Sequence, residues 1–240
     1  MITVHPVPIL SDNYAWLIRD SATGAVAVVD PAEAAPVAAA IDAAGGRLDL
    51  ILLTHHHSDH VAGTDEIRGR YTARVVGAAA DAHRLPKLDR AVAEGDTVTL
   101  GNSVAEVIDT PGHTRGHIAF YFENGDVLLC GDTLFSLGCG RLLEGTPAEM
   151  FASLAKLKEL PPDTQICCGH EYTENNARFA LSVDSGNAAL TAYAAKVKAM
   201  RAAGQPTVPS RLSDELACNP FLRAPDVARL AELRAAKDKF

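Results

Sequence analysis

The sequence predicts an α/β domain followed by a smaller helical domain. Apolar runs with high β propensity recur through the first part of the chain. Several of them are continuous, as in strands that are covered on both faces. After about Tyr172 no convincing strand follows, and only helix signals remain. We therefore expect domains at residues 1–171 and 172–240.

The expected strands are short apolar runs separated by turn or helix signals. They lie at residues 25–30, 48–54, 74–77, 105–110, 117–122, 126–131 and 165–168. Asn124-Gly125 stands before the run at 126–131, and this dipeptide is the strongest short signal for a β-hairpin. The strands at 117–122 and 126–131 are therefore expected to pair.

Helix signals separate some of these strands and fill the C-terminal part of the chain. Residues 32–44 form an alanine-rich run that indicates a helix. Thr146 and Glu149 have the spacing of a capping box, which predicts a helix over 147–160. Further helices are expected over 188–203 after the cap residue Asn187, from Ser213, and over 225–239.

The composition is typical of a globular protein from a reducing compartment. No run approaches the roughly 18 apolar residues that span a bilayer. Residues 1–12 lack the basic start and long apolar stretch of a secretory signal. The five cysteines are an odd number, and Cys167 and Cys168 are adjacent, which favours buried free thiols over a disulfide framework. We expect a cytoplasmic location and no membrane partner.

The charge balance argues against a nucleic-acid partner. The 22 Lys and Arg residues are outnumbered by 30 Asp and Glu residues, which leaves a net charge of −8. A general nucleic-acid binder usually has a basic face. Carboxylates that bind metal ions also contribute to a negative count, so part of this charge would be neutralised in a metalloprotein.

Four potential metal ligands are concentrated in residues 53–63, with the sequence LTHHHSDHVAG. They are His55, His57, Asp59 and His60. Residues at i and i+2 can converge on one ion just past a strand, with His56 between them pointing away, and an adjacent Asp-His pair can serve a second ion. The carboxyl edge of the strands is where open α/β folds place their sites. The alternative is a tag or an exposed polyhistidine loop, but a tag would stand at a terminus.

Three further strand ends repeat this pattern of an apolar run, a Gly or Pro turn and one ligand. His113 follows the run at 105–110, Asp132 follows the run at 126–131, and His170 follows the run at 165–168. A lone His after a strand is more often a cap or core residue. Four such strand ends indicate a metal site, and imidazoles with carboxylates suit Zn, Fe and Mn.

H-x-H-x-D-H followed by a downstream His, Asp and His resembles the signature of the metallo-β-lactamase superfamily. The resemblance implies an αββα sandwich, here with a C-terminal helical domain. It also implies two divalent metal ions per chain, Zn with Fe or Mn as alternatives. It assigns His55, His57 and His113 to the first metal, Asp59, His60 and His170 to the second, and Asp132 to a bridge between them.

Other segments resemble the glyoxalase II family within this superfamily. They include residues 9–18, which look like the N-terminal strand pair of that family. The others are residues 54–60, 131–135, 138–141, 168–173, 187–189, 218–223 and 234–238, so the resemblance spans the helical domain as well. It implies hydrolysis of S-D-lactoylglutathione and other S-2-hydroxyacylglutathione thioesters to a 2-hydroxy acid and glutathione, the second step of methylglyoxal detoxification. The nucleophile would be a hydroxide that bridges the metals, with Asp59 and Asp132 as catalytic residues. The partner is then a small-molecule S-acylglutathione, and we expect a monomer.

The resemblance assigns glutathione binding to five residues. They are Arg141, Tyr172, Asn176, Arg234 and Lys237. Arg and Lys can pair with the two carboxylates of glutathione, and Tyr and Asn can hydrogen-bond its peptide groups. Without the resemblance, Arg234 and Lys237 would be interpreted as solvated charges near a helix C-terminus. Arg141 and Leu143 stand where the eukaryotic enzymes have a Lys and a Tyr.

Three alternatives stay open. A persulfide dioxygenase shares much of the signature, but it uses a single Fe and normally lacks the long helical C-terminal domain. A nuclease of the superfamily would need a basic exosite, which the net charge does not suggest. A non-catalytic binding module would be expected to have lost metal ligands, and here none is missing.

Overall fold

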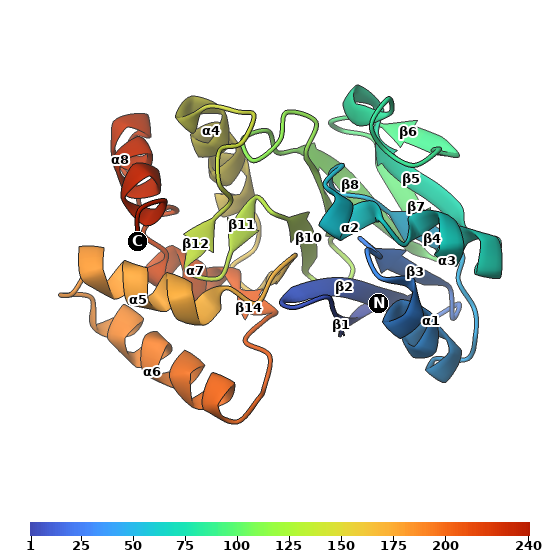
Figure 1. The fold of residues 1–240 in the computed structure, drawn as a ribbon, viewed down its shortest axis with the longest axis horizontal. Helices are drawn as coiled ribbons and strands as arrows, with labels where there is room; N and C mark the ends of the chain where they lie inside the picture. The colour runs from blue at the N-terminus through green and yellow to red at the C-terminus, as the bar shows by residue number, and fades with distance from the viewer. The chain divides into compact units, whose positions relative to one another are not determined.

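The computed structural model describes all 240 residues, and Figure 1 shows their helices and strands. The chain forms two compact units. Unit 1 comprises residues 1–109 and 116–131, and unit 2 comprises residues 110–115 and 132–240. No helix has both the length and the apolar character that a membrane crossing requires.

Unit 1 contains a six-stranded mixed sheet with the strand order β1-β2-β3-β4-β5-β6. Its strands are β1 (Ile2–Ile9), β2 (Asn13–Asp20), β3 (Val26–Val29), β4 (Leu50–Leu52), β5 (Arg74–Ala78) and β6 (Arg90–Val92). Strands β1 to β3 are antiparallel, and β3 to β6 are parallel. Parallel strands are covered on both faces, which accounts for the continuous apolar runs that predicted β3 and β4.

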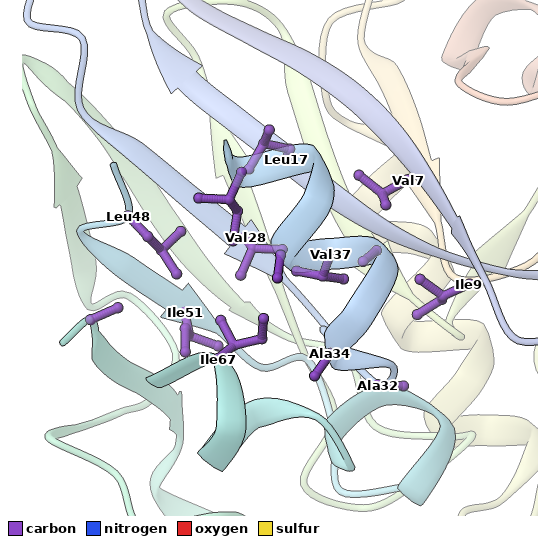
Figure 2. Close-up of a cluster of buried hydrophobic side chains, with 14 of the residues drawn as sticks. Val7, Ile9, Leu17, Val28, Ala32, Ala34, Val37, Leu48, Ile51 and Ile67 are labelled. Atoms are coloured by element: carbon purple, nitrogen blue, oxygen red, sulfur yellow. The ribbon is translucent and has the colours of Figure 1, made fainter. Parts of the chain in front are cut away.

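One apolar core of unit 1 lies between this sheet and two helices (Figure 2). Helices α1 (Ala34–Ala43) and α3 (Thr64–Tyr71) contact each other and contribute fully buried side chains, Val37 and Ile67. The short helix α2 (Ser58–Val61) precedes α3, and the 3-10 turn η1 (Ala79–Asp81) follows β5. This core fixes the carboxyl ends of β3 and β4.

The other strands of unit 1 form an antiparallel ladder in the order β10-β9-β8-β7. They are β7 (Thr97–Leu100), β8 (Ser103–Asp109), β9 (Ile118–Phe122) and β10 (Val127–Gly131). The predicted hairpin is confirmed, with Val127 opposite Phe122. Its positive φ angles fall at Gly125 (142°) and Asp126 (50°), so the turn uses the four residues between the strands.

Unit 2 consists mainly of helices. They are α4 (Pro147–Lys158), α5 (Thr173–Val183), α6 (Ala188–Ala202), α7 (Leu212–Cys218) and α8 (Val227–Lys237). Its strands are β11 (Leu134–Phe135), β12 (Gly138–Cys139), β13 (Gln165–Cys168) and β14 (Ser210–Arg211). The predicted caps are confirmed: Thr146 and Glu149 form a capping box, and Asn187 accepts the N–H of Leu190.

The segment around Ser213 differs from the prediction. Helix α7 begins one residue earlier, at Leu212, and has no side-chain cap. Backbone carbonyls replace the cap, because Leu212 N–H donates to Thr164 O (2.9 Å) and Ser213 N–H donates to Pro162 O (2.8 Å). The strand β14 just before it was not predicted. It pairs antiparallel with β13.

A buried carboxyl group anchors the turn between β11 and β12. Glu215 of α7 is fully buried, and its Oε2 accepts the N–H of Leu137 (2.7 Å) and the amide of Asn219 (3.0 Å). The bond to Leu137 holds a residue with positive φ (57°). Burial raises the pKa of the Glu215 carboxyl group. These contacts fix the loop whose next residues, Gly138 and Cys139, form β12.

All five cysteines are buried free thiols, as the sequence predicted. Burial raises the pKa of Cys139 to about 11 and that of Cys168 to about 12. It also raises the pKa of Cys167 well above the ordinary value and that of Cys218 to about 11. These thiols are therefore protonated at neutral pH.

Replacing Ile67 with Ala should lower the free energy of unfolding by about 2–5 kcal/mol, because it leaves a cavity in the core between α1 and α3. Val104→Ala deletes two methyl groups from a side chain that is 46% exposed, and it should change stability by less than about 0.5 kcal/mol. Urea denaturation of the metal-loaded variants measures both values. Equal losses in the two variants would contradict this location of the core.

Candidate metal centre and substrate cleft

A buried carboxylate, Asp30, organises the ligand-rich loop of unit 1. It follows β3 directly and has positive φ (52°). Its Oδ1 accepts the N–H of Thr54 (2.9 Å), and its Oδ2 accepts the Thr54 hydroxyl (2.6 Å). The same Oδ2 lies 2.9 Å from Nδ1 of His60. Because β3 and β4 are parallel neighbours, the residues after each strand meet at one edge of the sheet.

These contacts determine which ring nitrogens of His55 and His60 carry protons. A carboxylate only accepts hydrogen bonds, so His60 Nδ1 donates to Asp30. The Thr54 hydroxyl donates its hydrogen bond to Asp30. Its oxygen therefore accepts a hydrogen bond from Nδ1 of His55, 3.0 Å away. In the neutral rings, both Nε2 atoms then carry lone pairs. Such partners on the second nitrogen are typical of metal-binding histidines.

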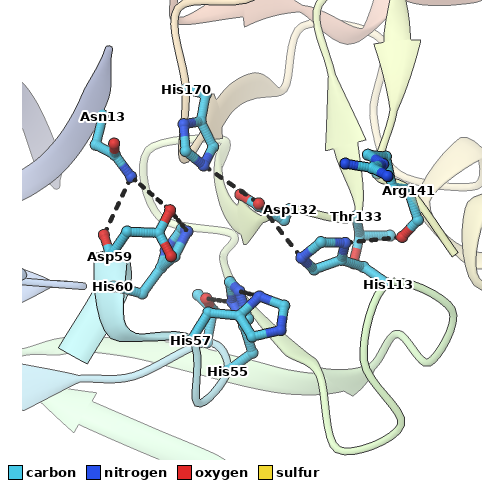
Figure 3. A network of polar contacts seen from close by, with 12 residues as sticks. Asn13, His55, His57, Asp59, His60, His113, Asp132, Thr133, Arg141 and His170 are labelled. Atoms are coloured by element: carbon cyan, nitrogen blue, oxygen red, sulfur yellow. Dashed lines mark hydrogen bonds and ion pairs between the residues drawn. The ribbon is translucent and has the colours of Figure 1, made fainter. Parts of the chain in front are cut away.

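His57 completes a pair of converging imidazoles in unit 1 (Figure 3). Its Nδ1 lies 3.1 Å from Nε2 of His55. Two nitrogens bound to one tetrahedral Zn at the usual bond length lie roughly 3.3 Å apart. This pair therefore has the separation of two ligands of a single ion. His117, expected at the start of a strand, stacks on His55 with ring centroids 4.8 Å apart.

Asp59 and His56 are held by partners that the sequence analysis did not identify. The side-chain amide of Asn13 donates to both the backbone oxygen and Oδ2 of Asp59, each at 3.1 Å (Figure 3). Oδ2 of Asp59 lies 3.8 Å from His60 Nε2. His56, predicted to point away from the metals, contacts Asp81 (3.1 Å). The loop that carries His56 and Asp59 is thus held by Asn13 and by Asp81.

In unit 2 one carboxylate lies between two imidazoles. Oδ2 of Asp132 is 3.5 Å from His113 Nε2 and 3.3 Å from His170 Nε2, as Figure 3 shows. His113 Nδ1 donates to the backbone oxygen of Arg141 (2.8 Å). In a neutral ring its Nε2 therefore has a lone pair directed to the Asp132 side. All three side chains are at least nine-tenths buried.

Close packing holds the segment that carries His113. The Ser153 hydroxyl of α4 donates to Pro111 O (2.7 Å). Gly112 has φ of 150°, and a Cβ there would lie 2.9 Å from the Met150 side chain. A Cβ on Gly140 would lie 1.9 Å from the backbone oxygen of Asp132. Residue 140 can therefore lie between Asp132 and His113 only because glycine has no side chain.

The residues present fit divalent metal ions. The donors are imidazole nitrogens and carboxylate oxygens without any thiolate, a set that Zn, Fe and Mn share. An electron-rich His113 Nε2 beside an Asp132 oxygen is favourable when both face a cation. The backbone oxygen of Arg141 and the Thr54–Asp30 pair supply the second-nitrogen contacts that orient such ligands.

All five residues that were assigned to glutathione line a single cleft in unit 2. Its volume is about 320 Å³, and Phe135, Cys139, Asn175 and Asp238 complete its lining. The Tyr172 ring stacks on His170, with centroids 4.5 Å apart and planes 7° from parallel. Asn176 is buried and donates to Ser136 O (3.0 Å). The cleft therefore adjoins the Asp132 cluster directly.

The three basic side chains of this cleft differ in exposure. The Arg141 side chain is 71% exposed, whereas Arg234 is only 6% exposed as a residue. Lys237 is partly buried, over the rings of Phe179 and Phe240. Burial, followed by the nearby Arg charges, lowers the pKa of Lys237 to about 8. The interpretation of Arg234 as a solvated surface charge is thus wrong.

Four contributing residues were missed by the sequence analysis: Asn13, Asp30, Asp81 and Asp238. Asp30 could have been identified because it follows an apolar strand, as the predicted ligands do. Asn13 and Asp238 lie in segments that resemble the family, although no role was assigned to either residue. Asn13 begins β2 and Asp81 ends η1. They act through contacts that depend on how the strands and loops pair, which their local sequence does not indicate.

Comparison with family models gives two matches that together cover almost the whole chain. Residues 10–170 match the metallo-beta-lactamase superfamily, and residues 171–240 match the hydroxyacylglutathione hydrolase C-terminus. The fold is accordingly a metallo-β-lactamase fold with mixed sheets and a C-terminal helical region, as predicted.

Curated relatives identify the family within this superfamily. A hydroxyacylglutathione hydrolase from Acidiphilium cryptum is 58% identical over 99% of this chain and 97% of its own length. One from Ruegeria pomeroyi is 55% identical over 100% of this chain and 99% of its own length. The chain belongs to the hydroxyacylglutathione hydrolase family, also called glyoxalase II, so the resemblance seen in the sequence is confirmed.

Solved structures show the same fold. ETHE1 from Myxococcus xanthus superposes with a TM-score of 0.73 at 23% identity, covering 97% of this chain and 90% of its own. TTHA1623, solved in a di-iron-bound form, gives a TM-score of 0.60 at 29% identity, over 69% of this chain and 91% of its own.

Replacing Asp30 with Asn should weaken metal binding roughly 10- to 100-fold. The amide removes the charge and can place an N–H against the donors of Thr54 and His60, so the two ligand rings lose their orientation. Competition with a chromophoric chelator measures the affinity. Asp49→Asn is the matched control, because Asp49 also accepts a backbone N–H at a strand end, that of Val26 (2.8 Å). Unchanged affinity in Asp30→Asn would contradict this role.

Proposed function

We propose that this protein hydrolyses S-D-lactoylglutathione and other S-2-hydroxyacylglutathione thioesters to a 2-hydroxy acid and glutathione. The observation that carries the proposal is the cleft of unit 2, which gathers all five predicted glutathione-binding residues beside the Asp132 cluster. Membership of the hydroxyacylglutathione hydrolase family supports it. The match of residues 171–240 to the C-terminal region of these hydrolases favours this activity over that of a persulfide dioxygenase.

We propose the following ligands for two divalent metal ions. His55, His57 and His113 would hold one ion, Asp59, His60 and His170 would hold the other, and Asp132 would contribute to both. We propose Zn as the bound metal, and the same donors can also bind Fe or Mn. The di-iron form of TTHA1623 supports iron as an alternative. When bound, such ions would lower the pKa of a water molecule so that hydroxide is available at neutral pH, and they would polarise a carbonyl group.

The protein side chains orient the reactants. Asn13 holds the Asp59 carboxylate in one orientation through its hydrogen bond to Oδ2. We propose that Asp59 accepts a hydrogen bond from the attacking water. Arg141 and Lys237 bind the carboxylates of glutathione, and Tyr172 lies between the cleft and His170. The leaving group is the glutathione thiolate, whose conjugate thiol has an ordinary pKa of about 8.5, so its expulsion requires no dedicated general acid.

The functional division that we propose follows the predicted domains. Residues 1–171 supply the metal ligands and Arg141, and residues 172–240 supply the other four predicted residues that line the glutathione cleft. The two family matches, which meet between residues 170 and 171, support this assignment.

The cellular role that we propose is the second step of methylglyoxal detoxification, performed by a monomer in the cytoplasm. Five buried free thiols support a reducing compartment. The substrate class supports the pathway, because S-lactoylglutathione is the thioester that this step consumes.

Purified protein should release D-lactate from S-D-lactoylglutathione, and a chelator should abolish the reaction, because the only strong nucleophile proposed depends on metal. Asp132→Ala should cost more turnover than any other single ligand change, since this carboxylate serves both ions. Asp163→Ala is the control, with a side chain that is 83% exposed. Near-normal turnover and metal content in Asp132→Ala would refute the dinuclear site. Oxygen uptake with glutathione persulfide, without thioester hydrolysis, would identify a dioxygenase instead.

The KM for S-lactoylglutathione should rise as the pH is raised from 7 to 9, because Lys237 loses its proton near pH 8. Its charged fraction falls roughly tenfold over this range, so KM should rise by up to about tenfold. Lys237→Arg stays charged throughout and should remove this part of the rise. Titration of the substrate itself affects both proteins equally. Identical KM profiles for the two proteins would show that Lys237 does not bind the substrate.

A further inference from the structure

One carboxylate stands among the basic groups of the cleft. Asp238 follows the last residue of α8, and its Oδ1 accepts from Nε (3.1 Å) and Nη2 (3.0 Å) of Arg234. Nε of Arg141 lies 4.0 Å from the same oxygen. All three contacts involve Oδ1, and the Asp238 side chain is 40% exposed. Oδ2 is therefore available to a ligand in the cleft.

Arg234 has little capacity to bind a ligand directly. Its Nη1 donates to the backbone oxygen of Cys139 (2.7 Å), and its other two nitrogens donate to Asp238. The guanidinium lies over the ring of Phe221, 5.3 Å from the centroid. With 6% of the residue exposed, Arg234 acts as a positioning residue for Asp238 and β12.

The charges that remain accessible in the cleft are two cations and one anion. The cations are Arg141 and Lys237, and the anion is Asp238, the one carboxylate among the lining residues. Glutathione, the carrier in the proposed substrate, has two carboxylates and one ammonium group. The cleft therefore presents the complementary set of charges.

Resting on the proposed function, we infer that Asp238 binds the α-ammonium group of the γ-glutamyl residue of glutathione. The α-carboxylate on the same carbon pairs with Arg141, whose exposed guanidinium also lies beside Asp238. Lys237 then binds the glycine carboxylate. Adjacent opposite charges suit an amino-acid head group better than a simple anion, because each charge of the ligand has its own partner. The cleft thus selects glutathione conjugates over other acidic thioesters.

Two non-hydrolysable probes test this inference on the metal-loaded protein at pH 7. One is S-methylglutathione, and the other is its des-amino analogue, in which a glutaryl group replaces the γ-glutamyl residue. Calorimetric titration should show that the wild type binds the first probe roughly three- to tenfold more tightly, as expected for a partly exposed charged pair. Asp238→Asn and Asp238→Ala should bind the two probes about equally.

The control is Glu232→Gln, on the same helix, where the Glu232 side chain is 67% exposed and pairs with Arg229. It should keep the wild-type preference. Arg234→Ala should reduce the preference, because Asp238 loses both donors. If Arg234 bound the ligand itself, that variant would weaken both probes by one factor and keep their ratio.

A wild type that binds both probes equally, or Asp238 variants that keep the preference, would overturn the inference. Neither probe contains a scissile thioester, so the result does not depend on turnover. A protein that discriminates between the probes yet fails to hydrolyse S-lactoylglutathione would contradict the proposed function alone.

Discussion

The pairing of Asp30 with Thr54 and His60 is the interaction on which the unit 1 ligands depend. A buried carboxylate is costly unless its oxygens are fully hydrogen-bonded, so Asp30 and its donors require one another. In the same arrangement the Thr54 hydroxyl fixes His55, the next residue along the chain. The residues after β3 and β4 and the imidazoles of His55 and His60 are thereby oriented before any ligand arrives. Preorganisation of this kind reduces the entropy that binding must offset.

The sequence indicates the candidate metal ligands more readily than the residues that support them, for a physical reason. Each candidate ligand follows its own strand, so a repeated local pattern indicates it, as at His113 and His170. A support acts through a partner that only the pairing of strands or helices brings near. Asp30 reaches Thr54 because β3 and β4 are parallel neighbours. Arg234 is buried because α8 brings it to the backbone of β12.

The fold was predictable where burial leaves a continuous or capped pattern, as in β3, β4 and α4. The sequence pattern missed β1, which contains Pro6 and Pro8, because proline argues against a strand. It is tolerated there since β1 is an edge strand. The helix α5 was missed because its N-cap residue, Tyr172, gives no side-chain cap and its first residues are polar. Tertiary packing outweighs local propensity in both cases.

The burial of every cysteine has a consequence for an enzyme whose product is itself a thiol. Exchange with glutathione disulfide begins with attack by an accessible thiolate. Cys139, Cys167, Cys168 and Cys218 have raised pKa values and lie inside the fold. A mixed disulfide with glutathione would require the surrounding structure to open first. The rate of catalysis by the enzyme should therefore depend on the supply of substrate and metal. It should not change with the ratio of reduced to oxidised glutathione.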